Sequence, residues 1–247
     1  MSELLDTFLN WDYIAQVLPD LLRTGLANTL VLAGFSAVFG TVLGLGLAVL
    51  GLSRHRWLRW PARVYTDVFR GLPAIVTILL VGQGLAIVAR PLVGTDPYPL
   101  GILALSLIAA AYIGEIFRAG IQSVDKGQSE AARALGMTHT ATMARVVVPQ
   151  GVRRVLPALV NQFISLIKDS SLVYFLGLLA SQRELFRIGQ DLASNTGNLS
   201  PLVAAGLVYL VITVPLTHLV NSIDRRLREG KPVPGGDSLD ELEPARA

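Results

Sequence analysis

The sequence predicts an all-α integral membrane protein with five transmembrane helices, an external N-terminus and a cytoplasmic C-terminus. Hydrophobic residues make up 52% of the 247 residues, charged residues make up only 16%, and the mean hydropathy is +0.53. The apolar residues also form long uncharged blocks rather than the stripes of amphipathic helices that cover a soluble core. This composition argues against a soluble enzyme and against a disordered chain.

Each expected crossing is an apolar segment long enough to pass through a hydrocarbon core of about 30 Å at about 1.5 Å per residue. The expected spans are about 24–52, 71–90, 97–117, 155–182 and 198–221. The fourth span differs because Lys168 and Asp169 divide it into two halves, neither of which would cross alone. We expect one interrupted crossing, with Ser170, Ser171 and Gly177 as places for a bend.

The remaining segments complete the expected domain organisation. Residues 1–23 form an external N-terminal segment, residues 24–222 a membrane domain that includes a loop at 127–149, and residues 223–247 a cytoplasmic tail rich in Pro and Gly. The first 23 residues carry four acidic side chains and no basic start, which argues against a cleaved signal peptide.

The basic residues predict the orientation. Of the 21 Lys and Arg residues, 16 lie between crossings one and two, between crossings three and four, or after crossing five. Short cytoplasmic loops are enriched in Lys and Arg, so these three segments are expected to be cytoplasmic. The net charge of +3 therefore reflects loop placement, and no nucleic-acid partner is expected.

Chemical motifs of enzymes and metal sites are not found in the sequence. The chain has no Cys, which excludes disulfides, thiolate metal sites and Cys nucleophiles. His55, His139 and His218 lack the spacing of metal ligands, so no metal is assigned. No HExxH or GxSxG motif occurs, and no catalytic residue is expected.

Two local patterns predict packing. Gly40 and Gly44 have the spacing that lets two membrane helices approach closely. Glu115 lies three residues before Arg118 and is expected to form a local salt bridge with it.

The loop at 127–149 contains Glu130-Ala131-Ala132, then three residues, Gly136, nine residues, Val146, one residue and Val148-Pro149. This pattern predicts a short Ala-rich helix that is opened by Ser129 and Glu130 and stopped by Gly136 in a left-handed cap. An exposed helix with small residues is a docking element that another surface can approach closely. An ordinary amphipathic surface helix is the alternative.

The spacing of this loop resembles the signature loop of the membrane subunits of ATP-binding-cassette (ABC) importers, with Val146 and Val148 in place of the usual Ile and Leu. The likeness continues in residues 69–73, 112–124, 156–162 and 166–172. Together these segments resemble the polar amino acid subfamily, which contains permeases for His, Arg, Gln, Glu, cystine and opines. The resemblance covers residues 18–227.

The resemblance implies a type I ABC importer permease fold and a multi-pass permease subunit of the bacterial cytoplasmic (inner) membrane, which translocates a polar amino acid. It also implies three partners: a cytoplasmic ABC ATPase dimer, a second permease subunit in a homodimer or heterodimer, and an extracytoplasmic substrate-binding protein. The residues that would couple to the ATPase are Glu130, Ala131, Ala132, Gly136 and Pro149. None of the three Lys residues lies in a phosphate loop, so ATP and Mg²⁺ would bind the partner ATPase and this chain no cofactor.

The expected substrate cavity lies around the interruption of the fourth crossing, because charged residues inside a span usually face a partner or a cavity. An amino acid is a zwitterion and needs an acceptor for its ammonium group and a donor for its carboxylate. The candidates are Asp169, Lys168, Ser170 and Asn161. Alternatively, the charged pair neutralises groups on adjacent helices, Lys168 extends toward the interface, and Asn161 joins helices.

Three other functions remain open from the sequence. The same importer class could carry another small polar solute, such as an opine or a peptide. An ion-coupled secondary carrier would use Lys168 and Asp169 for coupling and would transport without a partner or nucleotide. An intramembrane enzyme has the least support, because the crossings hold no paired catalytic carboxylates.

Overall fold

The structure, a computed structural model, describes residues 2–228, and within this range the chain is helical and contains no strand. Most of the expected tail at 223–247 lies outside the described residues. The elements are α1 (Ser2–Leu9), α2 (Trp11–Asp20), η1 (Leu21–Gly25), α3 (Leu26–Gly51), α4 (Arg56–Gly71), α5 (Ala74–Gly82), α6 (Ala86–Val93), α7 (Tyr98–Gln122), α8 (Lys126–Ala134), α9 (His139–Thr142), η2 (Met143–Val147), α10 (Val148–Asp169), η3 (Ser170–Leu176), η4 (Ala180–Gln182), α11 (Leu185–Thr196) and α12 (Ser200–Arg228).

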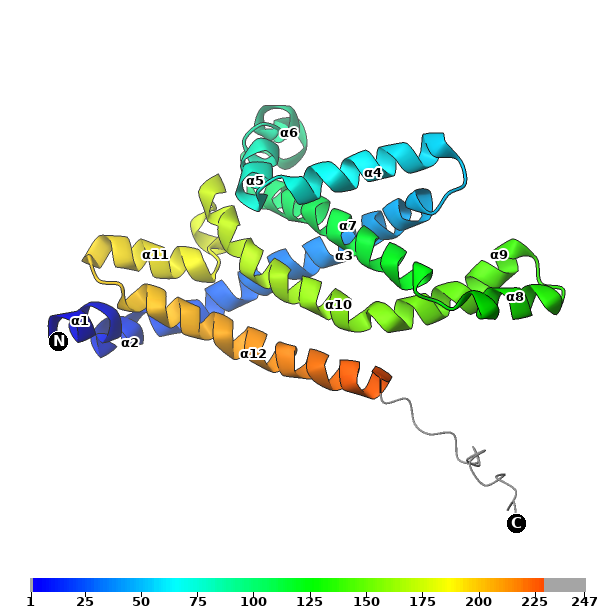
Figure 1. Cartoon of the computed structure of the whole chain (residues 1–247). Coiled ribbons are helices and arrows are strands. Elements are labelled where there is room, and N and C mark those ends of the chain that lie inside the picture. The colour runs from blue at the N-terminus through cyan, green and yellow to red at the C-terminus, as the bar shows by residue number, and fades with distance from the viewer. Residues whose placement is uncertain (1, 229–247) are drawn as a thin grey trace, which may run out of the picture.

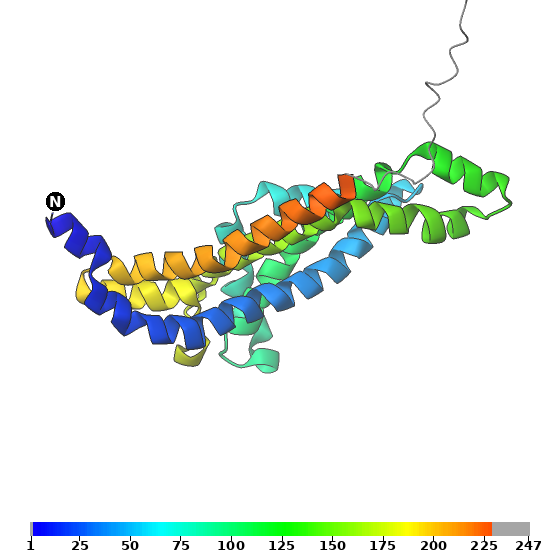
Figure 2. The same ribbon diagram turned by 90° about the horizontal axis from the view of Figure 1, so that it is seen from below.

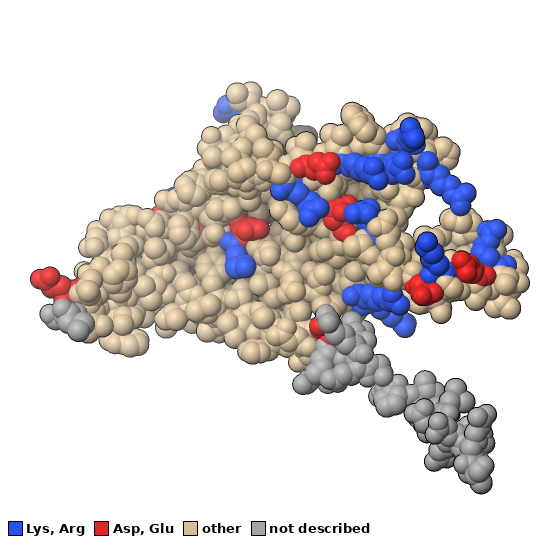
Figure 3. All heavy atoms as spheres, in the orientation of Figure 1, with Lys and Arg blue, Asp and Glu red and all other residues tan. Residues whose placement is uncertain are grey.

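The molecule is elongated, and its long helices run between two different ends. Figures 1 and 2 show α3, α10 and α12 extending along the length of the chain. One end holds α1, α2 and α11, and the other end holds α8 and α9. Basic side chains gather over α4 and toward the end with α8 and α9, whereas most of the remaining face carries no charge (Figure 3). This distribution matches the basic loops of the sequence.

Three helices of the described chain are long and apolar enough to cross a membrane: Glu3–Gly51, Tyr98–Gln122 and Ser200–Asp224. A fourth span arises if α4 and α5, which meet at an angle of 108°, are counted as one broken crossing. The expected span at 71–90 is thus not one helix, because α5 ends at Gly82 and α6 begins at Ala86. Helix α10 holds four charged residues and is not among these spans.

The interruption of the expected fourth span is visible in the backbone. Helix α10 continues to Asp169, where the chain tightens into the 3₁₀ helix η3 that begins at Ser170. Gly177 ends η3 with a φ of +74°, a left-handed conformation that favours Gly. The change at Ser170 and the stop at Gly177 agree with the bend predicted from the sequence.

Helix α3 contacts α7 more extensively than any other pair of described elements. Gly44 allows this approach, because a β-carbon at that position would lie 2.9 Å from the backbone nitrogen of Gly114 and 3.0 Å from the carbonyl oxygen of Ala110. The predicted close packing of the Gly40 and Gly44 face is therefore confirmed.

Two hydrophobic clusters stabilise the fold. The larger cluster joins α3, α5, α7, α10 and η3 around Leu105, Ile167 and Val173. The smaller cluster joins α2, η1, α11 and the first half of α12 around Leu21 and Leu185. Between helices in a membrane, close packing of such side chains stabilises the fold through van der Waals contacts. The two clusters form the middle of the molecule and the end that holds α1, α2 and α11.

Candidate functional site

A pocket of about 310 Å³ lies where α4, α5, α7 and α10 meet. Its polar lining consists of Tyr112 on α7 and Gln162, Ser165, Lys168 and Asp169 on α10, and its apolar lining includes Phe69, Leu72, Ala74 and Ile108. Successive polar residues of α10 in this lining lie three, three and one positions apart in the sequence. Most of them therefore share one face of the helix. An acid, a base and three uncharged polar groups thus line one concave surface.

The structure brings together two of the four residues expected to form a substrate cavity. Asp169 is half-buried and Lys168 is exposed, and both line the pocket. Ser170 is fully buried, and its hydroxyl donates a hydrogen bond to the carbonyl oxygen of Ile167 at 2.8 Å. Asn161 is exposed, and neither Ser170 nor Asn161 is part of the pocket lining.

A group of charged side chains adjoins the pocket at Tyr112. Arg118 donates two hydrogen bonds to the Glu115 carboxylate, from Nε to Oε1 at 2.8 Å and from Nη2 to Oε2 at 2.6 Å, which confirms the expected salt bridge. Arg70 lies 3.8 Å from the same carboxylate, and its guanidinium group lies 5.5 Å from the centre of the Tyr112 ring. These pairs are partly exposed, so they orient the side chains more than they stabilise the fold.

The predicted docking loop forms α8 and projects from the end of the molecule opposite α1 (Figure 1). The helix begins at Lys126, earlier than predicted, and its cap is Asp125, whose carboxylate accepts a hydrogen bond from the Gly127 N–H at 2.6 Å. The expectation that Ser129 and Glu130 open the helix was wrong, because Asp125 already satisfies the first free N–H group. The Ser129 hydroxyl instead donates to the carbonyl oxygen of Lys126.

Gly136 ends α8 as predicted. Its φ is +85°, its N–H donates to the carbonyl oxygen of Arg133, and the Met137 N–H donates to the carbonyl oxygen of Ala132. This pair of hydrogen bonds is the Schellman motif of helix ends, which needs a left-handed residue after the cap. Leu135, the cap residue itself, is 84% exposed.

Four of the five residues expected to dock a partner are exposed. Glu130, Ala131 and Gly136 are exposed, whereas Ala132 is buried against the rest of the loop. Pro149 is exposed at the second position of α10, after the π-helical turn η2. Sequence reasoning missed Leu135, whose apolar side chain is exposed at the tip of the loop.

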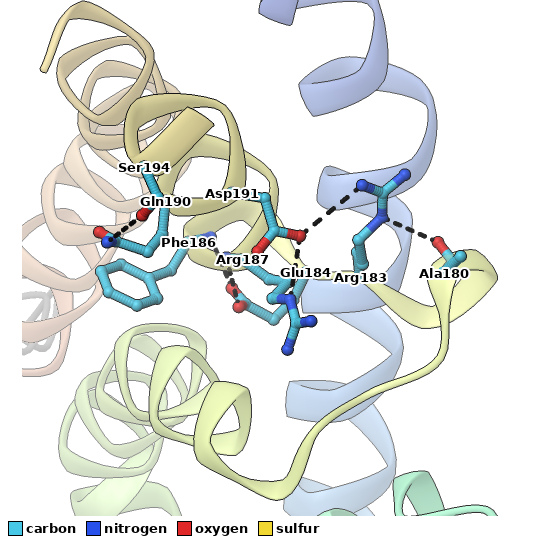
Figure 4. A network of polar contacts seen from close by, with 8 residues as sticks. All are labelled: Ala180, Arg183, Glu184, Phe186, Arg187, Gln190, Asp191 and Ser194. Atoms are coloured by element: carbon cyan, nitrogen blue, oxygen red, sulfur yellow. Dashed lines mark hydrogen bonds and ion pairs between the residues drawn. The ribbon is translucent and has the colours of Figure 1, made fainter. Parts of the chain in front are cut away.

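A second group of polar contacts lies at the start of α11, near the opposite end of the molecule. In Figure 4, Arg183 and Arg187 both point toward Asp191, at 3.7 Å and 3.0 Å from its Oδ2 atom. Glu184 points instead to the first turn of α11, where its carboxylate accepts hydrogen bonds from the N–H groups of Phe186 and Arg187, both at 2.6 Å. The Tyr209 hydroxyl donates to the same carboxylate at 3.1 Å.

Glu184 is fully buried, although it lies in the link before α11 and outside the membrane-spanning helices. Burial raises the pKa of its carboxyl group to about 7, against the opposing effect of the hydrogen bonds from Arg187, Phe186 and Tyr209. Sequence reasoning missed this residue. A single acid in a connecting segment is normally exposed, and only the packing of distant helices buries it.

Comparisons with known proteins point to one family. Residues 40–229 match the family described as "binding-protein-dependent transport system inner membrane component". The arginine transport system permease protein ArtQ of Bacillus subtilis (strain 168) is 38% identical over 224 residues, which cover 89% of this chain and 99% of ArtQ. The L-cystine transport system permease protein TcyB of the same organism is also 38% identical and covers 90% of this chain and 93% of TcyB.

Two further matches extend this likeness. The glutamate/aspartate import permease protein GltK of Escherichia coli O157:H7 is 37% identical over 88% of this chain and 97% of GltK. The crystal structure of an amino acid ABC transporter with histidines matches with a TM-score of 0.76 at 33% identity, over 86% of this chain and 96% of that chain. An inward-facing structure of the MetNI methionine ABC transporter matches in fold, with a TM-score of 0.68 at 21% identity over 84% of this chain and 96% of that chain.

Proposed function

The chain belongs to the family of binding-protein-dependent transport system inner membrane components and is a permease subunit of an amino acid ABC importer, and from this premise we propose that it passes a polar amino acid through the pocket beside Asp169. The single observation that supports this route is the pocket itself, whose wall holds an acid, a base and uncharged polar groups in an apolar surrounding. The relatives named for arginine, cystine and glutamate or aspartate support a polar amino acid as the class of substrate.

The chemistry of the pocket suits a zwitterion. The Asp169 carboxylate would accept hydrogen bonds from the substrate's ammonium group, and Lys168 would attract its carboxylate. Tyr112, Gln162 and Ser165 offer further hydrogen bonds. A substrate side chain would face the apolar residues of α4, α5 and α7.

The energy for transport would come from partner subunits that bind ATP and Mg²⁺. We propose that α8 is the coupling helix and that Glu130, Ala131, Ala132, Gly136 and Pro149 mark the surface received by a cytoplasmic ABC ATPase dimer. The exposed Leu135 at the tip of α8 would add apolar contact area. When the two ATPases close around ATP, α8 and its counterpart in a second permease subunit would approach each other, and the pocket would change from inward-facing to outward-facing.

The proposed topology follows from the charges and the family. The N-terminus lies outside and the C-terminus in the cytoplasm of a bacterial inner membrane, and the chain crosses five times if the segments around α5 and α10 count as crossings. The end that holds α1, α2 and α11 would then face an external substrate-binding protein. The end that holds α8 and α9, where basic side chains gather, would face the ATPase (Figure 3).

Asp169→Asn tests the substrate route. The substitution removes the negative charge and one acceptor for the ammonium group, so ATP-driven uptake should fall about tenfold or more, which corresponds to the loss of one hydrogen bond to a charged group. The assembled complex should be recovered in normal amounts. Asp67→Asn, which changes an exposed acid on α4, is the matched control and should leave uptake unchanged. Uptake kinetics of Asp169→Asn equal to those of the unchanged chain would remove Asp169 from the route.

A further inference from the structure

The buried carboxylate of Glu184 joins three parts of the fold. It accepts hydrogen bonds from two N–H groups of α11 and from the hydroxyl of Tyr209 on α12. Next to it, the Leu185 N–H donates to the hydroxyl of Thr29 on α3 at 3.2 Å, and Thr29 is fully buried as well. Burying an acid among three elements is costly unless its oxygens are satisfied, so this arrangement is held in one geometry.

Tyr209 lies where the two hydrophobic clusters meet. Its side chain packs against the larger cluster of the membrane core and also against the smaller cluster around α2 and α11. The hydroxyls of Thr29 and Ser170 lie near the Tyr209 hydroxyl, although their hydrogen bonds are made to the Leu185 N–H and the Ile167 carbonyl oxygen. Because Ser170 directly follows Asp169, the group formed by Glu184, Tyr209, Thr29 and Ser170 reaches the backbone beside the proposed substrate pocket. We call this group the Glu184 cluster.

The start of α11 also packs directly on η3, the segment that follows Asp169. The rings of Tyr174 on η3 and Phe186 on α11 meet edge to face, with their centres 5.3 Å apart. The Arg187 guanidinium group lies 5.1 Å from the centre of the same Tyr174 ring. The first turn of α11, which Glu184 caps, therefore packs against η3, the segment that directly follows α10.

From this geometry we propose that Glu184 is a positioning residue for transport: its carboxylate fixes Tyr209 and the first turn of α11, and through Ser170 and η3 it fixes the position of Asp169 in the pocket. The proposal rests on the pocket assigned above. It gives the end of the molecule that holds α11 a direct physical connection to the substrate route, although Glu184 itself does not line the pocket.

The ionised form of Glu184 suits this role, because a carboxylate accepts all three hydrogen bonds whereas an amide in its place would present a donor to one of them. With a pKa near 7, the carboxyl group is largely ionised above pH 7 and protonated below it. In the described chain, the charged or titratable groups facing it are Arg187 on α11 and Tyr209 on α12, and α3 and η3 present the hydroxyls of Thr29 and Ser170.

Glu184→Gln and Tyr209→Phe test the proposal in the complete importer reconstituted in proteoliposomes. The first keeps the shape of the side chain, and the second removes only the hydroxyl, so the complex should assemble in both. Uptake per ATP hydrolysed should fall about tenfold in Glu184→Gln, as expected for one lost hydrogen bond to a charged group. Because the amide resembles the protonated acid, the difference from the unchanged chain should grow as the pH rises above about 7 and shrink below it.

Asp20→Asn is the matched control for these variants. It changes an exposed acid at the end of α2, in the same end of the molecule, whose side chain makes none of the hydrogen bonds of the Glu184 cluster. It should leave uptake per ATP and its pH profile unchanged. Equal uptake in Glu184→Gln and the unchanged chain at pH 8 would overturn the proposal, and so would an equal loss in Asp20→Asn.

The reaction rate of a thiol placed in the pocket lining reports how accessible that position is, without requiring transport. The chain has no Cys, so Ser165→Cys places a single thiol in the pocket lining, and Ser129→Cys places one on α8. Adding Glu184→Gln should change the reaction rate of the pocket thiol with a water-soluble methanethiosulfonate severalfold and leave the thiol on α8 unaffected. An unchanged rate in the pocket would show that Glu184 does not position α10. Normal uptake in Asp169→Asn, by contrast, would remove the substrate assignment even if the thiol rate changed.

Discussion

Gly136 fixes the end of α8, the proposed coupling helix. Its left-handed φ of +85° completes the hydrogen bonds that end α8 and turns the chain back toward α9. A β-carbon at Gly136 would meet no atom within 4 Å, so the requirement for Gly is conformational and not spatial. The residue therefore sets the direction of the proposed coupling helix through its backbone conformation.

Gly136→Val should distort this turn. A β-branched residue in the left-handed region costs about 1–2 kcal/mol relative to Gly, and the chain would escape that cost by unwinding the last turn of α8. We expect severalfold less ATPase to co-purify with the permease, with unchanged insertion into the membrane. Gly136→Asn is the control, since Asn tolerates this conformation and should retain the ATPase. Normal co-purification with Gly136→Val would contradict the coupling assignment.

Single residues differ in how well the sequence predicts them. Lys168 and Asp169 could be singled out because charges inside an apolar segment are rare, and both line the pocket. Gly136 could be predicted because its spacing and its residue type agree. Glu184 could not be predicted, because its burial depends on α3, α11 and α12 meeting at one point, and nothing in its local sequence distinguishes it from an exposed acid.

At the level of the helices, packing between α3 and α7 is the contact most open to a direct test. Gly44→Val would push side-chain atoms into the backbone of Gly114 and Ala110, which already lie about 3 Å from an ideal β-carbon. Overpacking of this kind costs about 1–3 kcal/mol, so the purified protein should unfold at a lower temperature in detergent.

Gly46→Val is the control for this substitution on the same helix. A β-carbon at Gly46 meets no atom within 4 Å, and the added side chain would point away from α7. It should change the unfolding temperature little. Equal destabilisation by both substitutions would mean that the loss of Gly itself matters, and not the approach of α7.

The presence of the helices could be predicted from the length of the apolar segments. The breaks within those segments could be predicted only in part. The segment at 71–90 is apolar throughout, yet the chain bends by 108° between α4 and α5. The sequence Gly71-Leu72-Pro73 explains the bend, because a residue before Pro avoids the helical region and Leu72 is extended, with ψ at 140°. The start of α8 was predicted too late for a different reason. The sequence offers two possible caps, Asp125 and Ser129, and Asp125 takes that role.

For the whole molecule, the orientation in the membrane is the first property to test. Because the chain contains no Cys, single substitutions at Thr7 on α1 and Ser129 on α8 introduce unique thiols. An impermeant thiol reagent added to intact cells should label Thr7→Cys, and Ser129→Cys should react only after the membrane is opened. The reverse pattern would invert the proposed topology.

Transport is a property of the whole assembly, in which we propose that this permease carries a polar amino acid with energy from partner ATPases. The most direct measurement is uptake of labelled basic, acidic and amide amino acids into proteoliposomes that hold the chain with its ATPase, any second permease subunit and its binding protein. We expect uptake of at least one of them that requires ATP and disappears when the ATPase is omitted. Uptake by this chain alone, without nucleotide or partner, would contradict it and identify a secondary carrier.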